Sequence, residues 1–209
     1  VFWQYIIATL FALPLILRIG VSKLRTKHPY WHEIRALLSA LGVQFFAFGF
    51  ALGVPVWQMV ALSMTGPFFI LLGATLFLGE RLTVQLLGAT ITGFVGAVMV
   101  SQIGTEQFTL ASLLPVLAAL CWGSVSVITR YLSRDEEPES LTLYMLVLIT
   151  PNHFLIGLLV GIAVAVLPVG ALPAGLATGF DFQLPLGDPL MLIVLLGLVT
   201  AGAQYFLSF

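Results

Sequence analysis

Seven apolar stretches, each close to the length of a membrane-spanning helix, constrain this sequence more than any other feature. They run over 1–19, 36–52, 54–78, 84–101, 108–132, 140–167 and 189–209, and charged residues, proline or glycine fill the breaks between them. A helix needs about 20 mostly apolar residues to cross the hydrocarbon core of a bilayer. Because no water is available there, each spanning segment must satisfy its own backbone hydrogen bonds. The sequence therefore predicts an all-α integral membrane protein, a polytopic bundle with seven spans.

Composition agrees with this fold class and excludes several functions. Hydrophobic residues make up 60% of the chain and charged residues only 8%, whereas a soluble domain carries about 25% charged residues. A net charge of -1 gives no basic surface for nucleic acid. The lone cysteine, Cys121, lies in an apolar setting that favours an inert buried thiol. The spans show no nucleophile beside a base and no Cys/His cluster, so we predict no enzyme activity, no metal and no cofactor.

The positions of the basic residues predict the orientation of the chain. If the spans alternate in direction, all 8 lysines and arginines fall on one side, in or beside the first, third and fifth connections. Basic residues concentrate in cytoplasmic loops, so we expect the loops 20–35, 79–83 and 133–139 to be cytoplasmic and the protein to lie in the cytoplasmic (inner) membrane. Both ends of the chain fall inside apolar runs, which we interpret as the ends of a piece of a longer protein.

Polar residues inside the spans are the candidates for a binding site, since burying them in a membrane is costly. Gln58 and Thr65 share one helical face, and Trp122 and Ser126 share another. Two interpretations stay open for them: a polar cavity, or hydrogen bonds between helices and, for Ser and Thr, to their own helix backbone. Pro67 lies well inside its span and predicts a kink there.

Part of the chain resembles a known transporter family. The run "ALSMTGP" at 61–67, the run "LFLGERLT" at 76–83 and the glycines that follow are similar to EamA-type members of the drug/metabolite transporter superfamily. The segment 113–134 resembles the opening helix of that family's second repeat, and 143–151 and 195–206 resemble the next two spans. The resemblance implies ten spans in two inverted five-helix repeats, of which this chain has seven and lacks the first and the last two. The repeats would divide the chain into 1–104 and 105–209.

The same resemblance implies a function and a site. It implies a secondary transporter that moves a small metabolite or drug-like compound across the membrane by alternating access. The residues then expected to line the cavity are Gln44, Phe48, Gln58, Thr65, Trp122, Ser126 and Gln204. A structural or gating role is expected for Pro67, Gly79, Glu80 and Arg81.

Several alternatives remain open. Glu80 could belong to a plain solvated turn, or could contact a helix N-terminus or a basic residue of 18–35. Seven spans with an outside start also fit a membrane receptor or sensor. Coupling to a proton or counter-substrate and assembly into a homodimer are left undecided, and the expected partners are the lipid bilayer and a small-molecule substrate.

Overall fold

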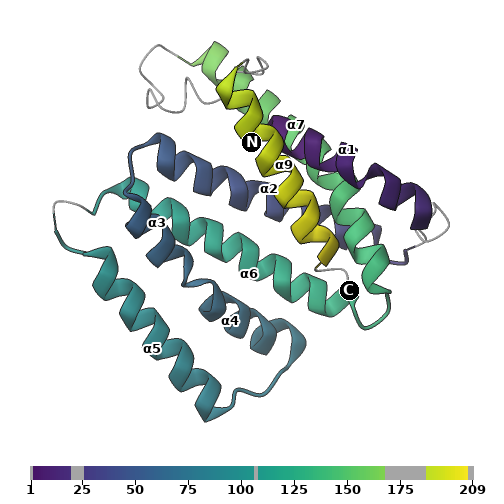
Figure 1. The fold of residues 1–209 in the computed structure, drawn as a ribbon. Coiled ribbons are helices and arrows are strands. Elements are labelled where there is room, and N and C mark those ends of the chain that lie inside the picture. The colour runs from purple at the N-terminus through teal and green to yellow at the C-terminus, as the bar shows by residue number, and fades with distance from the viewer. Residues whose placement is uncertain (1, 20–25, 106–107, 168–186, 207–209) are drawn as a thin grey trace. The chain divides into compact units, whose positions relative to one another are not determined.

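The structure, a computed structural model, describes residues 2–19, 26–105, 108–167 and 187–206. Every regular element within these ranges is a helix (Figure 1). The elements are α1 (Phe2–Ile19), α2 (Pro29–Ala51), α3 (Val56–Ser63), α4 (Gly66–Leu78), α5 (Val84–Ser101), the short 3-10 helix η2 (Leu110–Leu113), α6 (Leu114–Leu132), α7 (Pro138–Val166) and α9 (Asp188–Phe206). The prediction of an all-α chain is therefore confirmed for the part that the structure describes.

Five helical segments of the described residues are long and apolar enough to cross a membrane. They are Pro29–Ala51, Val56–Leu78, Val84–Ser101, Leu110–Leu132 and Pro138–Val166. The stretches expected at the two ends also form helices, but their described apolar parts, Phe2–Phe11 and Pro189–Thr200, are shorter. The structure thus supports a multi-pass membrane protein, while the count of seven spans and the inverted repeats stay predictions.

Local sequence signals explain where the helices of the central region begin and end. The expected kink is a full break: α3 ends at Ser63, α4 begins at Gly66, and Pro67 occupies the first turn of α4. Proline is tolerated there because the first N–H groups of a helix have no helical partner. Gly79 ends α4 with φ 67°, a left-handed conformation that glycine adopts at little cost. Thr83 then caps α5 by accepting a hydrogen bond from the backbone N–H of Leu86 at 3.3 Å, as expected of a threonine at this position.

The first basic loop is shorter than the sequence indicated. We expected a loop over 20–35 and a span from 36, but α2 begins at Pro29, so 29–35 is helical. Seven extra residues add about 10 Å of helix. Our prediction was wrong because it treated charged and aromatic residues as a break, although such side chains do not interrupt a helix that starts with proline. Residues 20–25 lie outside the described part of the chain.

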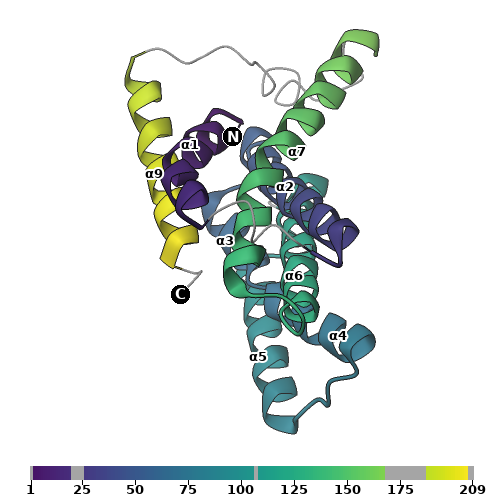
Figure 2. The same ribbon diagram turned by 90° about the vertical axis from the view of Figure 1, so that its right-hand side faces the viewer.

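The chain forms two compact units, and the first contains α1, the part of α2 up to Ala40, α7 and α9. In this unit α1 packs against both α9 and α7, as Figures 1 and 2 show. Polar side chains join these helices: Gln4 donates to Thr200 at 3.0 Å, and the hydroxyls of Thr9 and Thr150 are 2.9 Å apart. Hydrogen bonds of this kind help to hold helices together where lipid removes the hydrophobic driving force.

The second unit contains the rest of α2, α3, α4, α5, η2 and α6 up to Tyr131. Here α5 contacts α3 and α4, and α3 contacts η2. A close approach to the backbone of α4 involves Gly123 of α6, where an added Cβ would lie 2.8 Å from Phe69 Cβ and 3.3 Å from the backbone nitrogen of Ile70. Small residues permit such close backbone contact. These packing units do not test the division into repeats at 104/105, which remains a prediction.

Candidate functional site

Six of the seven side chains expected to line a cavity belong to the second unit. Gln44 and Phe48 lie on α2, Gln58 on α3, Thr65 in the α3–α4 break, and Trp122 and Ser126 on α6. Gln44, Gln58 and Thr65 are buried, Phe48 and Trp122 are half-buried, and Ser126 is exposed. The seventh, Gln204, belongs to α9, and its side chain lies outside what the structure describes. The substrate-binding role of all seven stays a prediction.

Gln58 is the centre of a neutral hydrogen-bond network. Its amide nitrogen donates to the carbonyl of Ser101 at 2.8 Å, and its amide oxygen accepts from the Ser112 hydroxyl at 3.0 Å. The Ser112 hydroxyl in turn accepts from the backbone N–H of Thr109 at 3.1 Å. The three residues of this network, Gln58 on α3, Ser101 on α5 and Ser112 on η2, are fully buried. A buried amide satisfied at both ends joins these three elements, so the structure shows a packing role for Gln58.

The hydroxyl groups of Thr65 and Ser126 are bound to their own helical segments. Thr65 donates to the carbonyl of Leu62 at 2.7 Å, and Ser126 donates to the carbonyl of Trp122 at 3.0 Å. Such bonds satisfy a hydroxyl in an apolar environment without a partner helix. Of the two interpretations that the sequence left open, the structure therefore shows local backbone bonding for both residues.

The indole ring of Trp122 packs against α2 at the position of Gly42. A Cβ added to Gly42 would stand 2.6 Å from the indole Nε1, so the indole occupies the space that a larger residue would need. Phe46, one turn further along α2, has its ring centroid 5.6 Å from that of Trp122, and the Phe50 ring lies 5.1 Å from that of Phe46. The result is an aromatic surface shared by α2 and α6, with Gln44 on the same stretch of α2.

The turn between α4 and α5 carries the residues with a predicted gating role. Glu80 forms an ion pair with Arg130 at the end of α6, with Arg130 Nε and Glu80 Oε1 2.7 Å apart. For Glu80 we left open a plain solvated turn or a contact with a helix N-terminus or a basic residue of 18–35; the basic residue that the structure pairs with it is instead Arg130, within its own unit. Arg81 is exposed. The pair gives the turn a structural contact; a gating role stays a prediction.

A polar cluster in the first unit was missed by the sequence analysis. His32 Nε2 is 2.6 Å from Glu136 Oε2, and Glu136 Oε1 accepts a hydrogen bond from the Thr26 hydroxyl. One turn along α2, Arg35 donates through Nη2 to the carbonyl of Leu141 and lies 3.5 Å from His32 Nδ1. We call Thr26, His32, Arg35 and Glu136 the His32 cluster. It joins the start of α2 to the α6–α7 turn and the first turn of α7.

One feature of the sequence signals this cluster in retrospect. His32 and Arg35 are three residues apart and so share a face of α2. Glu136 lies within the acidic run "DEEPE", where nothing distinguishes it from its neighbours. The signal is thus visible on α2 but absent on the partner side.

His153 of α7 packs against α1. Its ring is stacked on Tyr5, with centroids 4.3 Å apart and an interplanar angle of 26°. The neighbouring Asn152 donates to Glu33 Oε1 at 2.9 Å and to the carbonyl of Leu148 on its own helix. Across the described residues, no group of three or more His, Cys, Asp or Glu side chains is placed to hold a metal ion.

Comparison with known proteins relates this sequence to membrane transporters. The chain is 44% identical to a riboflavin transporter of Rhizobium johnstonii over 207 residues, which cover 99% of this chain and 62% of that protein. It is 42% identical to a riboflavin transporter of Brucella anthropi over 205 residues, covering 98% and 66%. A S-adenosylmethionine uptake transporter of Rickettsia bellii is 29% identical over 143 residues, covering 68% and 49%.

The chain therefore spans less than two thirds of the length of these relatives. No protein-family model and no solved structure matches it. The names of the relatives, together with the long apolar helices, point to a family of membrane transporters for small metabolites and do not favour a receptor or an enzyme.

Proposed function

We propose that this chain is part of a secondary transporter that carries riboflavin across the cytoplasmic membrane. The observation that carries the proposal is the match to two proteins named as riboflavin transporters, at 44% and 42% identity over 99% and 98% of the chain. The match to a S-adenosylmethionine transporter is weaker, at 29% over 68% of the chain. Sequence similarity thus favours riboflavin over S-adenosylmethionine as the substrate.

The proposed mechanism is alternating access in an EamA-type arrangement of two inverted repeats, 1–104 and 105–209. An inverted pair of repeats can face either side of the membrane by exchanging the conformations of its two halves. The one-sided distribution of lysine and arginine supports an orientation in which the connections after α1, α4 and α6 are cytoplasmic. The long apolar helices supply the membrane-embedded frame that this mechanism needs.

We propose that riboflavin binds beside the aromatic surface of α2 and α6. Riboflavin has a flat, uncharged three-ring system whose imide edge offers both hydrogen-bond donors and acceptors, and a polyhydroxyl side chain. An indole ring suits stacking on such a ring system, and a glutamine amide offers a matching donor and acceptor. Trp122 and Phe48 are therefore proposed as apolar contacts and Gln44 as the polar contact, with Gln58, Thr65, Ser126 and Gln204 as the remaining predicted lining.

The test is uptake of radiolabelled riboflavin into proteoliposomes that contain the full-length protein. We expect accumulation above that of protein-free vesicles, and competition by unlabelled riboflavin but not by S-adenosylmethionine. Binding without accumulation inside the vesicles would favour the receptor or sensor. Accumulation of S-adenosylmethionine in place of riboflavin would reject the proposed substrate.

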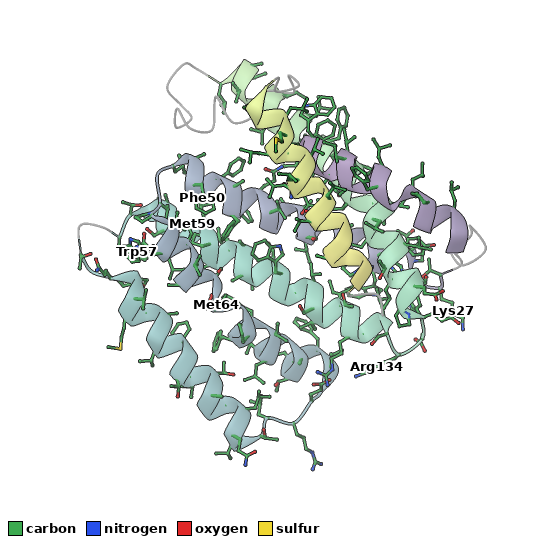
Figure 3. The ribbon with its side chains drawn as sticks, in the orientation of Figure 1. Lys27, Phe50, Trp57, Met59, Met64 and Arg134 are labelled. Atoms are coloured by element: carbon green, nitrogen blue, oxygen red, sulfur yellow. The ribbon has the colours of Figure 1, made fainter. Side chains whose placement is uncertain are left out.

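A matched pair of tryptophan variants tests the site. Trp122→Ala should weaken riboflavin binding about tenfold, since stacking and burial of an aromatic ring contribute on the order of 1 kcal/mol or more. Trp57, labelled in Figure 3, is an exposed tryptophan on α3, and Trp57→Ala should leave binding unchanged. Equal affinities in the two variants would remove Trp122 from the site.

A further inference from the structure

Glu136 is a buried carboxylate in an otherwise exposed acidic turn. Its side chain is 7% exposed, whereas Asp135 and Glu137 on either side are exposed. Removing a carboxylate from water is unfavourable unless hydrogen bonds and an opposite charge compensate it. Both oxygens have such partners, Thr26 on Oε1 and His32 on Oε2. Glu136 is therefore buried while the acidic residues on either side of it are not. Its burial depends on contact with Thr26 and His32.

The contact between His32 and Arg35 indicates a neutral imidazole. A guanidinium group only donates hydrogen bonds, so the contact between Arg35 Nη2 and His32 Nδ1, at 3.5 Å, requires Nδ1 to accept. The ring proton then lies on Nε2 and points to Glu136, 2.6 Å away. In this arrangement Glu136 is negative, Arg35 is positive and the imidazole between them is neutral. The buried charges balance.

We propose that the His32 cluster is a proton-responsive connection between the start of α2 and the α6–α7 turn. A proton bound at His32 Nδ1 removes the acceptor that faces Arg35 and places two cations side by side in a buried setting. Arg35, which also holds the carbonyl of Leu141, then separates from the imidazole. Acidification from pH 7.5 to 5.5 crosses the range in which histidine changes charge and loosens the connection.

The surroundings of His32 contain few other groups that could respond to pH. The titratable and charged groups that face it are Glu136 from the turn, Arg35 and His28 from its own side, and Tyr144 of α7, whose ring is stacked on the imidazole with centroids 4.0 Å apart. His28 in turn lies 3.6 Å from Asp135. Of these, His28 is the second imidazole, so it supplies the matched control.

The consequence for transport rests on the proposed function. The cluster joins two segments on the side of the chain that we propose to be cytoplasmic, so its protonation should change the rate at which the transporter cycles. We expect the riboflavin uptake rate to differ about fivefold or more between pH 7.5 and 5.5, within the usual range of coupling between two sites.

The first measurement needs no transport. Lys27 and Arg134, labelled in Figure 3, are exposed residues on the two joined segments. Spin labels on Lys27→Cys and Arg134→Cys, in a Cys121→Ser background of the full-length protein, report the distance between these segments. We expect the distance distribution to broaden and lengthen at pH 5.5. In His32→Gln, whose amide can still donate to Glu136 and accept from Arg35 but does not titrate, the distribution should be the same at both pH values.

His28→Gln is the control, since the His28–Asp135 pair is more accessible than the His32–Glu136 pair, with side chains 25% and 60% exposed. It should keep the response of the unmodified protein, both in distance and in uptake. A distribution that does not change with pH, or one that changes equally in His32→Gln, would overturn the proposal. A loss of the pH response only in His28→Gln would also overturn it. If riboflavin uptake is absent at both pH values while the distances respond as expected, the proposed function fails and the proton-responsive connection stands.

Discussion

The α4–α5 turn and the α6–α7 turn each carry a carboxylate paired with a basic side chain, but the two pairs differ in burial. The side chains of Glu80 and Arg130 are 30% and 63% exposed, whereas those of Glu136 and His32 are 7% and 0% exposed. An exposed ion pair contributes at most about 1 kcal/mol because water and salt screen it. A buried polar pair has a larger effect when one partner is removed, because the other partner is left without compensation.

The same contrast separates the interiors of the two units. The first unit buries charged and titratable groups, among them His32, Arg35 and His153. The second unit buries neutral ones, including Gln44, Gln58 and Ser112, and keeps Glu80 and Arg130 accessible to solvent. Buried charged groups therefore add to neutral contacts such as Gln4–Thr200 in the first unit, while the buried polar groups named in the second unit are neutral.

Removal of the Glu136 carboxylate should have the largest effect. Glu136→Ala leaves His32 and the buried Arg35 without their acid, and we expect a loss of about 3 kcal/mol in the free energy of unfolding. Thermal unfolding of the purified protein in detergent measures it. The neighbouring acid Glu137 is exposed, so Glu137→Ala should cost less than about 0.5 kcal/mol. Similar losses of unfolding free energy in Glu136→Ala and Glu137→Ala would mean that burial gives the Glu136 carboxylate no larger effect than an exposed one.

Close packing in the second unit is tested by adding a methyl group. Gly123→Ala places a Cβ 2.8 Å from Phe69 Cβ and 3.3 Å from the backbone of α4, so we expect a loss of about 2 kcal/mol through displacement of the helices. Gly93 of α5 has nothing within 4 Å of an added Cβ, and Gly93→Ala should be neutral or slightly stabilising. The same unfolding experiment compares them, and a neutral Gly123→Ala would show that α4 and α6 are not held at this distance.

The effect of the neutral network should be intermediate between those of the buried Glu136–His32 pair and the exposed Glu80–Arg130 ion pair. Gln58→Leu removes the donor to Ser101 and the acceptor for Ser112, and we expect a loss of about 1–2 kcal/mol because buried polar groups are left unsatisfied. Riboflavin affinity measured at a temperature where the variant is folded separates this packing role from binding. A stable variant with weakened binding would place Gln58 in the substrate site instead.

The exposed ion pair should have the smallest effect. Glu80→Gln keeps the shape of the side chain and removes the charge opposite Arg130, and the expected loss is below about 1 kcal/mol, decreasing further in high salt. Unfolding measured at low and high salt checks both statements. A salt-independent loss as large as that of Glu136→Ala would mean that the turn is buried in the membrane-embedded protein.

Local patterns predicted much of the fold, since helix position depends on the length of an apolar run and on nearby residues. The runs 84–101 and 108–132 match helical segments of the structure closely, and Thr83 and Pro67 act as their chemistry predicts. The start of α2 was predicted too late because the charged residues after Pro29 were taken as a loop, whereas the helix begins at Pro29 and continues through them. A Cβ added to Gly88, Gly93 or Gly96 of the run 84–101 would meet no neighbouring atom within 4 Å.

The partners of polar side chains could not be predicted in the same way. Hydrogen bonding of Ser126 to its own backbone depends on a rotamer, and the pairing of Glu80 with Arg130 depends on how α6 lies against the turn. The burial of Glu136 depends on contact with α2, more than 100 positions away in the sequence. Such contacts are set by how the helices pack against one another, and the local sequence pattern does not contain this information.

The break between α3 and α4 gives this segment a mechanical property that its hydropathy does not suggest. Backbone bonds continue through it, from Met64 to Val60 and Ala61, from Thr65 to Leu62 and from Phe68 to Thr65. The N–H that proline lacks would fall in the first turn of α4, where no helical partner is required. Two helices are thus joined by a short link whose backbone groups remain hydrogen-bonded. The chain can therefore leave the regular helix within the span Val56–Leu78 without presenting these polar groups to lipid.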